Sequence, residues 1–167
     1  MKKLVLLMAL FLFTILAVTC DADEIKGRIT AVDTNAGIID ISGVKVTVQA
    51  ARMEDENDMP MTFDALSAGD YLEIEGFFSG PCQMMAVKIE RDYQEQDEIK
   101  GRIESVDAAN NKLVISGVTV TISEAASLEG RDDMQISVSQ LNVGDYIECD
   151  GSWNGTAEFL ASKLELD

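Results

Sequence analysis

Two acidic loops carry the side chains best suited to metal chemistry in this sequence. They cover residues 54–58 and 129–133 and are rich in Asp and Glu. Calcium binds about six to eight oxygen ligands, which carboxylate-rich loops can supply. The spacing of the acids does not fit an EF-hand, and Arg131 offsets the charge of the second loop. Solvated loops are therefore the favoured interpretation, and a calcium-type cation site is the alternative. Its candidate ligands are Glu54, Asp55, Asp58, Asp132 and Asp133.

Three aromatic residues form a second candidate binding element. Phe77 and Phe78 lie just before a glycine-containing reversal of the chain, and Trp153 occupies the matching place in the second half of the sequence. Aromatic rings at such a site can stack on a glycan or pack against an apolar side chain of a protein partner. They can equally cap the open end of a barrel, in which case their removal lowers stability.

Catalysis has little support because the sequence contains no histidine. That excludes Ser-His-Asp and Cys-His relays and the commonest zinc sites. A pair of carboxylates could still act as acid and base. The acids that recur in both halves, Glu73 with Glu148 and Glu90 with Glu165, alternate with apolar residues, as on a solvated sheet face. We therefore predict no enzymatic activity and no cofactor. The expected cross-strand partners of these acids are Lys26, Arg28 and Lys88.

Two cysteines remain once Cys20 is assigned to an export signal. Cys149 occupies an inward strand position that Ile74 fills in the first half, while Cys82 follows a chain reversal. An oxidising compartment would permit a disulfide between Cys82 and Cys149. The simpler interpretation is that Cys149 is a small core hydrophobe.

The first 20 residues predict export. Lys2 and Lys3 precede an apolar run over residues 4–18, which is short for a membrane span but typical of a signal-peptide core. The stretch Leu-Ala-Val-Thr-Cys, which ends at Cys20, resembles the lipobox of bacterial lipoproteins, in which the cysteine is lipidated after cleavage. We expect a periplasmic or cell-surface protein held at the membrane by a lipid on Cys20. Conventional cleavage after Ala22 would instead leave a soluble periplasmic protein.

The chain that follows the leader is strongly acidic. Of the 13 basic and 30 acidic residues in the sequence, only Lys2 and Lys3 belong to the leader, which leaves 11 against 30 and a formal charge of −19. This charge opposes binding to nucleic acid, where Lys and Arg must neutralise phosphates. It also opposes adhesion to anionic lipid, so we expect the membrane to be reached through the anchor alone.

A tandem repeat positions these candidates. The heptapeptide DEIKGRI begins at Asp23 and again at Asp97, 74 residues later, and the match continues through most of each half. One residue is inserted between Thr121 and Asp133, after which the offset is 75. We assign the first repeat to residues 23–92 and the second to residues 97–167. The linker, residues 93–96, spans at most about 14 Å, so the two repeats must be neighbours.

Each repeat has the pattern of a small all-β domain. Ile25, Gly27 and Ile29 alternate with polar residues, as a half-buried strand requires. A tight turn at Ser42-Gly43 joins two further strands into a hairpin, and one helical turn follows the acidic loop. Two last strands flank the aromatic reversal. We predict two tandem five-stranded barrels of the oligonucleotide/oligosaccharide-binding (OB) type, with a small sandwich as the alternative.

Both repeats contain the succession G-R-I-x-x-V-D, I-S-G-V-x-V, L-x-x-G-D-Y and A-x-K, which resembles the bacterial exported domains of unknown function 5666. The resemblance covers residues 24–91 and 98–166. It implies a small β-barrel in an exported, often lipid-anchored protein, and it supplies no catalytic residues. The function we expect is that of a non-catalytic envelope lipoprotein that binds or scaffolds a protein or glycan. The alternative is a cation-binding exported protein that uses the acidic loops.

Overall fold

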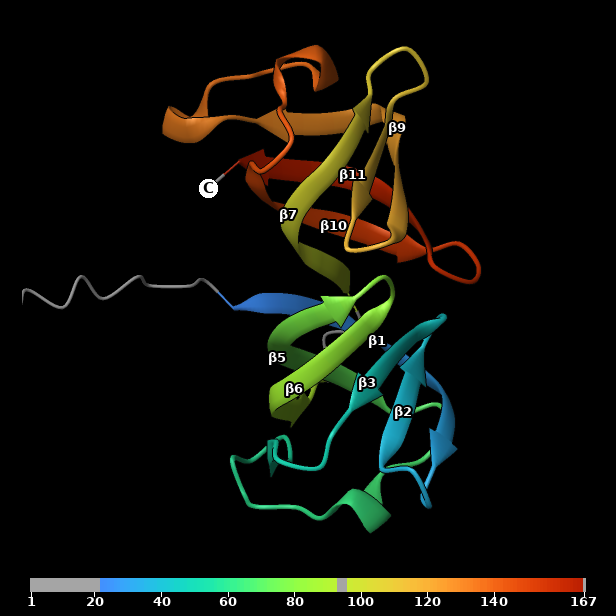
Figure 1. Cartoon of the computed structure of the whole chain (residues 1–167). Helices are drawn as coiled ribbons and strands as arrows, with labels where there is room; N and C mark the ends of the chain where they lie inside the picture. The colour runs from blue at the N-terminus through green and yellow to red at the C-terminus, as the bar shows by residue number, and fades with distance from the viewer. Residues whose placement is uncertain (1–21, 93–95, 167) are drawn as a thin grey trace, which may run out of the picture.

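The computed structural model describes residues 22–92 and 96–166 and consists of two β-barrels, one for each repeat (Figure 1). The expected signal peptide with Cys20 lies outside the described residues, as does most of the expected linker. Within the described chain, no helix has the length and apolar character needed to cross a membrane. The helices that are present there are single 3-10 turns.

Five strands close the first barrel, as the sequence predicts. β1 (Asp23–Asp33) pairs antiparallel with β2 (Ile38–Ile41) and with β5 (Tyr71–Gly80). A hairpin joins β2 to β3 (Val44–Thr47), which runs parallel to β6 (Gln83–Arg91). The antiparallel pair β5–β6 completes a ring of OB type. A short additional strand, β4 (Arg52–Glu54), pairs with β6, and the helical turn η1 (Phe63–Ala65) precedes β5.

The second barrel repeats this ring with β7 (Asp97–Asp107), β8 (Lys112–Ile115), β9 (Val118–Glu129), β10 (Tyr146–Trp153) and β11 (Glu158–Leu166). β9 is continuous over the length that β3 and β4 cover separately, and it pairs parallel with β11. The helical turn predicted for each repeat is η1 in the first and η3 (Val138–Gln140) in the second. A further turn, η2 (Arg131–Asp133), lies in the lengthened loop of the second repeat.

Alternation along the strands separates core from surface. Ile25 and Ile29 are buried on β1, whereas the intervening Arg28 is exposed. Ile74 on β5 and Cys149 on β10 occupy equivalent positions, and both are fully buried. Cys149 thus packs as a small apolar core side chain. Both Cys149 and Cys82 are free thiols in the structure.

One continuous run of strands joins the two barrels. β1 pairs antiparallel with β7, with Ile25 opposite Ile99 at the middle of the pairing. Because β1 also pairs with β5 and β7 with β10, the strands follow the order β6-β5-β1-β7-β10-β11 across both barrels (Figure 1). Ile25 and Ile99 are equivalent residues of the repeats, so the pairing is centred on a pseudo-twofold axis. We call this pairing and the contacts around it the seam.

Candidate functional site

Tyrosine side chains extend the seam beyond the β1–β7 pairing. The hydroxyl of Tyr71 in the first repeat donates to Asp97 Oδ1 in the second at 3.0 Å. Its counterpart Tyr146 donates to the carbonyl of Ala22, at the start of the first repeat. These two contacts cross the seam in opposite directions, although their acceptors differ, a carboxylate in one and a backbone carbonyl in the other. The first residues of each repeat are therefore held by the other barrel.

The chain reversals between the last two strands of each repeat also contact the opposite barrel. The Cys82 N–H donates to the Ser116 carbonyl (2.7 Å), and the equivalent Ala157 N–H donates to the Ser42 carbonyl (2.6 Å). Next to Ser42, Gly43 has a φ of 95° and lies against the second reversal, where any added side chain would collide with backbone. These reversals border the ligand face in an isolated OB-type barrel. Here they are used in part to join the repeats.

The three aromatic candidates have different surroundings. Trp153 donates its indole N–H to the Lys26 carbonyl (2.9 Å) and packs edge-to-face on Phe159, with ring centroids 5.2 Å apart. Phe78 is partly buried against the core, while Phe77 on the opposite face of β5 is 43% exposed. The structure does not bring these three rings together. Trp153 has a role that the sequence did not reveal, which is to hold the second repeat to β1 of the first.

In the first acidic loop, the carboxylates bond to their own chain. Asp55 Oδ1 accepts the N–H groups of Asn57 and Met59, at 2.9 and 3.0 Å. Glu54 is buried and forms an ion pair with Arg52. Both acids therefore have protein partners. A cation site would instead need their carboxylate oxygens free to coordinate an ion.

The other predicted cation ligands do not gather around one point. Asp58 and Asp132 have positive φ angles, 59° and 74°, which Asp tolerates in tight turns. The side chain of Asp133 lies outside the described part of the chain. Among the described side chains, no acid of either loop belongs to a group of three carboxylates with oxygens close enough to share an ion.

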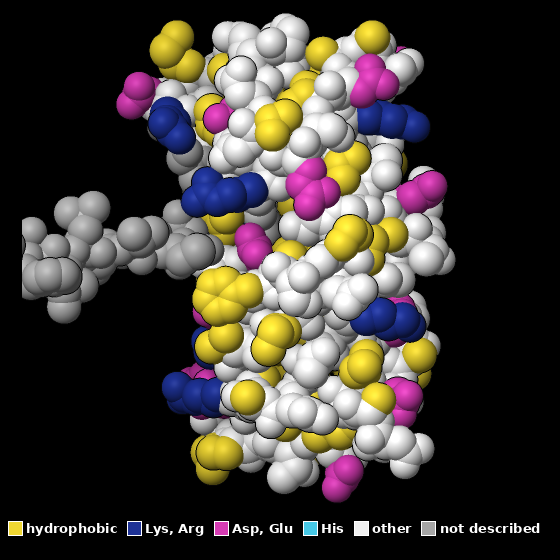
Figure 2. All heavy atoms as spheres, in the orientation of Figure 1, with side chains coloured by type: hydrophobic (Ala, Val, Ile, Leu, Met, Phe, Trp, Pro, Cys, Tyr) yellow, Lys and Arg dark blue, Asp and Glu magenta, His cyan; other side chains and the backbone are white. Residues whose placement is uncertain are grey.

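Carboxylates do converge on the outer face of the joined sheet. Lys26 Nζ lies among them, 3.0 Å from Glu98 of the second repeat and 3.4 Å from Glu73 of the first. Lys100, the counterpart of Lys26, is 3.2 Å from Glu148. The two convergent groups are Glu73, Glu75 and Glu90, and Glu98, Glu148 and Asp150. The lysines give these groups the character of a salt-bridged sheet face, and Figure 2 shows charges of both signs interspersed with hydrophobic side chains on the face it displays.

The sequence anticipated part of this charged face. Lys88 Nζ lies 3.6 Å from Glu75 on the neighbouring strand β5, as expected for a cross-strand pair, and 2.6 Å from Glu90 on its own strand. Arg28 donates to the Gly69 carbonyl at 2.9 Å, and its guanidinium lies over the Tyr71 ring. The position of Lys26 between acids of both repeats was not foreseen, because it depends on the β1–β7 pairing.

Burial changes the protonation of this cluster. It raises the pKa of Glu98, and the attraction of Lys26 offsets only part of that rise. Burial also raises the pKa of Glu24 and of Glu73. For Lys26, burial acts to lower the pKa, but the hydrogen bonds and charges of Glu98 and Glu24 outweigh it and raise the pKa above the ordinary value. The lysine stays charged while the acids retain their protons to a higher pH than usual.

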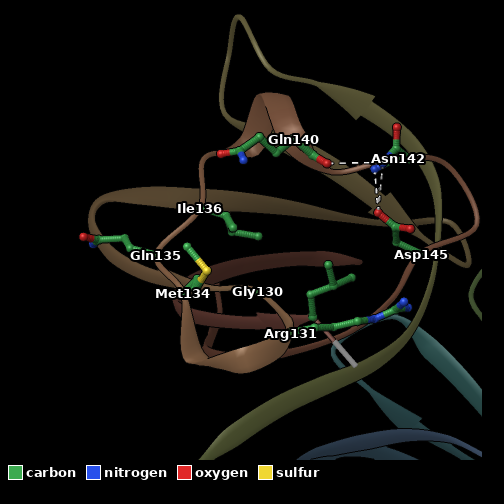
Figure 3. A pocket seen from close by; sticks show the side chains of 9 residues that line it. Gly130, Arg131, Met134, Gln135, Ile136, Gln140, Asn142 and Asp145 are labelled. Carbon is green, nitrogen blue, oxygen red and sulfur yellow. Dashed lines mark hydrogen bonds between the residues drawn. The ribbon is translucent and has the colours of Figure 1, made fainter.

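A pocket of about 360 Å³ opens in the second repeat beside the loop that follows β9 (Figure 3). Met134, Ile136 and Leu166 form its apolar lining. The lining is completed by Gly130 and by five polar or charged residues, Arg131, Gln135, Gln140, Asn142 and Asp145. Figure 3 shows the side chains arranged around a common opening. Asn142 is held in place because its N–H donates to Asp145 Oδ2 at 2.7 Å and its side-chain amide to the Gln140 carbonyl at 3.2 Å.

In the first repeat, Arg91 takes the place of Leu166. Its Nη2 donates to the Ala65 carbonyl and to Asp70 Oδ2, both at 3.0 Å. Ala65 and Asp70 are the counterparts of Gln140 and Asp145. The arginine side chain therefore spans the space that the leucine leaves open in the second repeat.

Sequence reasoning pointed to the loop of residues 129–133 but missed the residues that complete the pocket. A signal was present in the alignment of the repeats. Arg91 aligns with Leu166 and Ala65 with Gln140, which are changes of size and polarity at positions where the framework is otherwise kept. Their consequence is visible only when η3 and β11 are seen to face the loop.

Comparison with known families identifies both barrels. A family model described as "Domain of unknown function (DUF5666)" matches residues 26–90 and residues 100–165, one match in each barrel. Together the matches cover most of both repeats and leave out the segment that joins them. No curated protein matches the chain.

Proposed function

We propose that this chain, which belongs to the DUF5666 family, is a non-catalytic binding module of the cell envelope. The observation that carries the proposal is the pocket of the second repeat, whose counterpart in the first repeat is occupied by Arg91. A duplicated domain with this site filled in the first repeat and open in the second offers this binding position in the second repeat alone. The first barrel then serves as support for the second.

The pocket suits an apolar side chain of a protein partner. Its volume of about 360 Å³ is at the small end of the range for ligand sites, about 300–1,000 Å³. Met134 at its edge is 67% exposed, and methionine adapts its shape to different apolar groups. No aromatic ring lines the pocket, which disfavours the stacking that a glycan would use. Gln140 and Asn142 can fix the backbone of a bound segment by hydrogen bonds.

The N-terminal leader sequence supports the cellular location that we propose for the module. The apolar run over residues 4–18 and the lipobox-like sequence ending at Cys20 support export and lipidation. The formal charge of −19 on the remaining chain disfavours nucleic acid as a partner. We therefore place the protein in the periplasm or at the cell surface, anchored to a membrane through Cys20.

A non-catalytic role is supported by the chemistry of the chain. It has no histidine, and its convergent carboxylates lie on a sheet face where lysines pair with them. The pocket itself contains one carboxylate, Asp145, whose Oδ2 accepts the Asn142 N–H. A single committed carboxylate does not make the acid–base pair that hydrolysis requires.

Photocrosslinking in intact cells tests the pocket. A photoreactive amino acid replaces Met134 at the pocket edge, and Met59, its counterpart in the first repeat, is the matched control position. Leu166→Arg copies the side chain that fills the first repeat, where it can reach the Gln140 carbonyl and Asp145. We expect position 134, but not position 59, to capture one protein of constant size, and Leu166→Arg to abolish that product.

Two controls make the result decisive. Thermal melting establishes that the Leu166→Arg protein is folded, as its resemblance to the first repeat predicts. Arg91→Leu makes the reciprocal change in the first repeat and should leave crosslinking at position 134 intact. An undiminished crosslink in a folded Leu166→Arg protein would refute the pocket as the binding site.

A further inference from the structure

Three exposed apolar side chains lie together on the outer surface of β5 and β6. Phe77 on β5 is the register partner of Met85 on β6, and Val87 follows at the irregularity where the pairing shifts by a residue. Their exposed fractions are 43%, 56% and 53%. We call these three residues the β5–β6 apolar patch. Alternation along the two strands keeps their side chains out of the barrel core.

The fold does not require an apolar surface at this place. The equivalent positions in the second repeat are Ser152, Leu160 and Ser162, so two of the three are polar. The two barrels otherwise share the same five-strand ring and the symmetric backbone pairing of β1 with β7. The reason for an apolar patch here must therefore be a feature that lies beside the first repeat and not beside the second.

The two repeats differ in the segment of chain that leads into each barrel. β1 begins at Asp23, which is the register partner of Gly76, the residue before Phe77. Asp23 Oδ2 also accepts the Phe78 N–H at 3.0 Å, which fixes the start of β1 against this end of β5. Cys20 precedes Asp23 by three residues, a span of at most about 10 Å when extended. In the second repeat the equivalent position receives the linker instead.

We infer that the β5–β6 apolar patch rests on the surface of the membrane that holds the Cys20 lipid. Neighbouring strands are about 4.8 Å apart and Phe77 is one residue beyond Gly76, so an anchor at Cys20 lies within about 20 Å of Phe77. Phenylalanine, methionine and valine gain from leaving water at such a surface. The contact is apolar in nature, because the neighbouring Glu75 is half-buried and its carboxylate lies 3.6 Å from Lys88 Nζ, which leaves no unpaired basic group to attract anionic headgroups at this carboxylate. This inference rests on the lipid anchor included in the proposed function.

The test compares two matched positions in the intact lipoprotein. Single cysteines replace Met85 in the patch or its counterpart Leu160 in the second repeat, in a Cys82→Ala background that copies Ala157. Each is labelled with an environment-sensitive fluorophore, and the protein is reconstituted in phosphatidylcholine vesicles that contain lipids with a quencher. The parent protein without an added cysteine reports any labelling of Cys149. We expect quenching at position 85 to exceed that at position 160 by about threefold or more, as a probe at the surface differs from one held away from it.

The outcomes separate the patch from the anchor. Mass spectrometry of the purified protein reports acylation of Cys20; an unmodified Cys20 overturns both the anchor and this inference. With Cys20 acylated, equal quenching at positions 85 and 160 overturns the inference alone. Phe77→Ser with Val87→Ser imports the residues of the second repeat, and in a protein that melts normally it should lower quenching at position 85 to the level of position 160. Quenching that survives this double substitution also counts against the patch.

Discussion

The indole N–H of Trp153 in the second repeat donates to the carbonyl of Lys26 in the first, at 2.9 Å. The pseudo-twofold axis relates Trp153 to Phe78, which has no donor to offer the Lys100 carbonyl. The seam is therefore symmetric in its backbone pairing and asymmetric in this side-chain contact. The tryptophan is also close to Gly27, where an added Cβ would lie 2.7 Å from its ring nitrogen. Trp153 and Gly27 thus form a matched pair across the seam.

Replacing Trp153 should weaken the whole molecule. Trp153→Ala removes a partly buried ring together with its contact to Phe159, and we expect the free energy of unfolding to fall by about 2–4 kcal/mol. Trp153→Phe keeps an apolar ring and loses the hydrogen bond to Lys26, which should lower it by about 1 kcal/mol. Urea denaturation followed by circular dichroism measures both. Equal stability of the alanine variant and the wild type would show that Trp153 is not part of the seam and would restore it as a candidate for ligand stacking.

The acids around Lys26 should make stability depend on pH. Burial raises the pKa of Glu98, Glu24 and Glu73 in the folded protein above the ordinary value of 4.5. A raised pKa means that the folded state binds protons more tightly, so this contribution is complete below pH 4.5 and is lost as pH rises through the folded-state values. We expect the free energy of unfolding to increase as pH falls from about 7.5 to about 4.5.

The sign reverses at lower pH for another group. Burial acts to raise the pKa of Asp40, but hydrogen bonds from Lys45, Thr30 and Gly43 outweigh it and lower the pKa below 3.8. The stability that Asp40 contributes is therefore present above pH 3.8 and is lost in stronger acid.

Substitutions test the contribution of the acids around Lys26. Glu98→Gln should flatten the increase in the free energy of unfolding between neutral pH and pH 4.5, and Glu24→Gln, its less buried counterpart, should flatten it less. A Glu98→Gln protein with the full wild-type pH dependence would contradict this assignment.

Local patterns predicted the barrels but not the seam. Ile25 and Ile29 are the residues that β1 contributes to the core, and their alternation with polar residues can be recognised from a few neighbouring positions of the sequence. Asp97 and Lys26 belong to the same repeated heptapeptide, and nothing near them in the sequence indicates that Tyr71 or Trp153 of the other repeat will bond to them. Such contacts depend on how two finished barrels meet, which is a long-range property. The short linker predicted only that the barrels are neighbours.

The pocket was out of reach for a related reason. The pocket is open because Leu166 has a short side chain, whereas the equivalent residue of the first repeat, Arg91, has a long one. A hydrophobic residue near the end of an amphipathic strand reads as an ordinary core position, and η3 and β11 must be placed before the gap between them is apparent. The acidic loop attracted attention because of its carboxylates, yet the residues of the loop that line the pocket are Gly130 and Arg131, and the exposed Met134 follows directly after the loop.

The two thiols should differ in reactivity. Cys149 is fully buried, and burial raises the pKa of its thiol far above the ordinary value, so it is protonated as well as inaccessible. Cys82 is only partly buried, and burial followed by the charge of Glu104 raises its pKa. In a protein whose Cys20 has been replaced by Ser, we expect a disulfide-exchange reagent to titrate a single thiol in the native state and the second only after unfolding. Native protein that yields no free thiol in either state would indicate a disulfide between Cys82 and Cys149.

Calcium should leave the stability of the protein unchanged. Asp55 is committed to its own loop, Glu54 to Arg52, and the acids that do converge are paired with lysines. A bound cation would have to displace these partners, so we expect calcium at about 5 mM to shift the melting temperature by no more than about 1 °C. Magnesium at the same concentration controls for general screening of the negative charge. A rise of several degrees with calcium alone would favour cation binding, and its loss in Asp55→Asn or in Glu98→Gln would tell the loop from the sheet face.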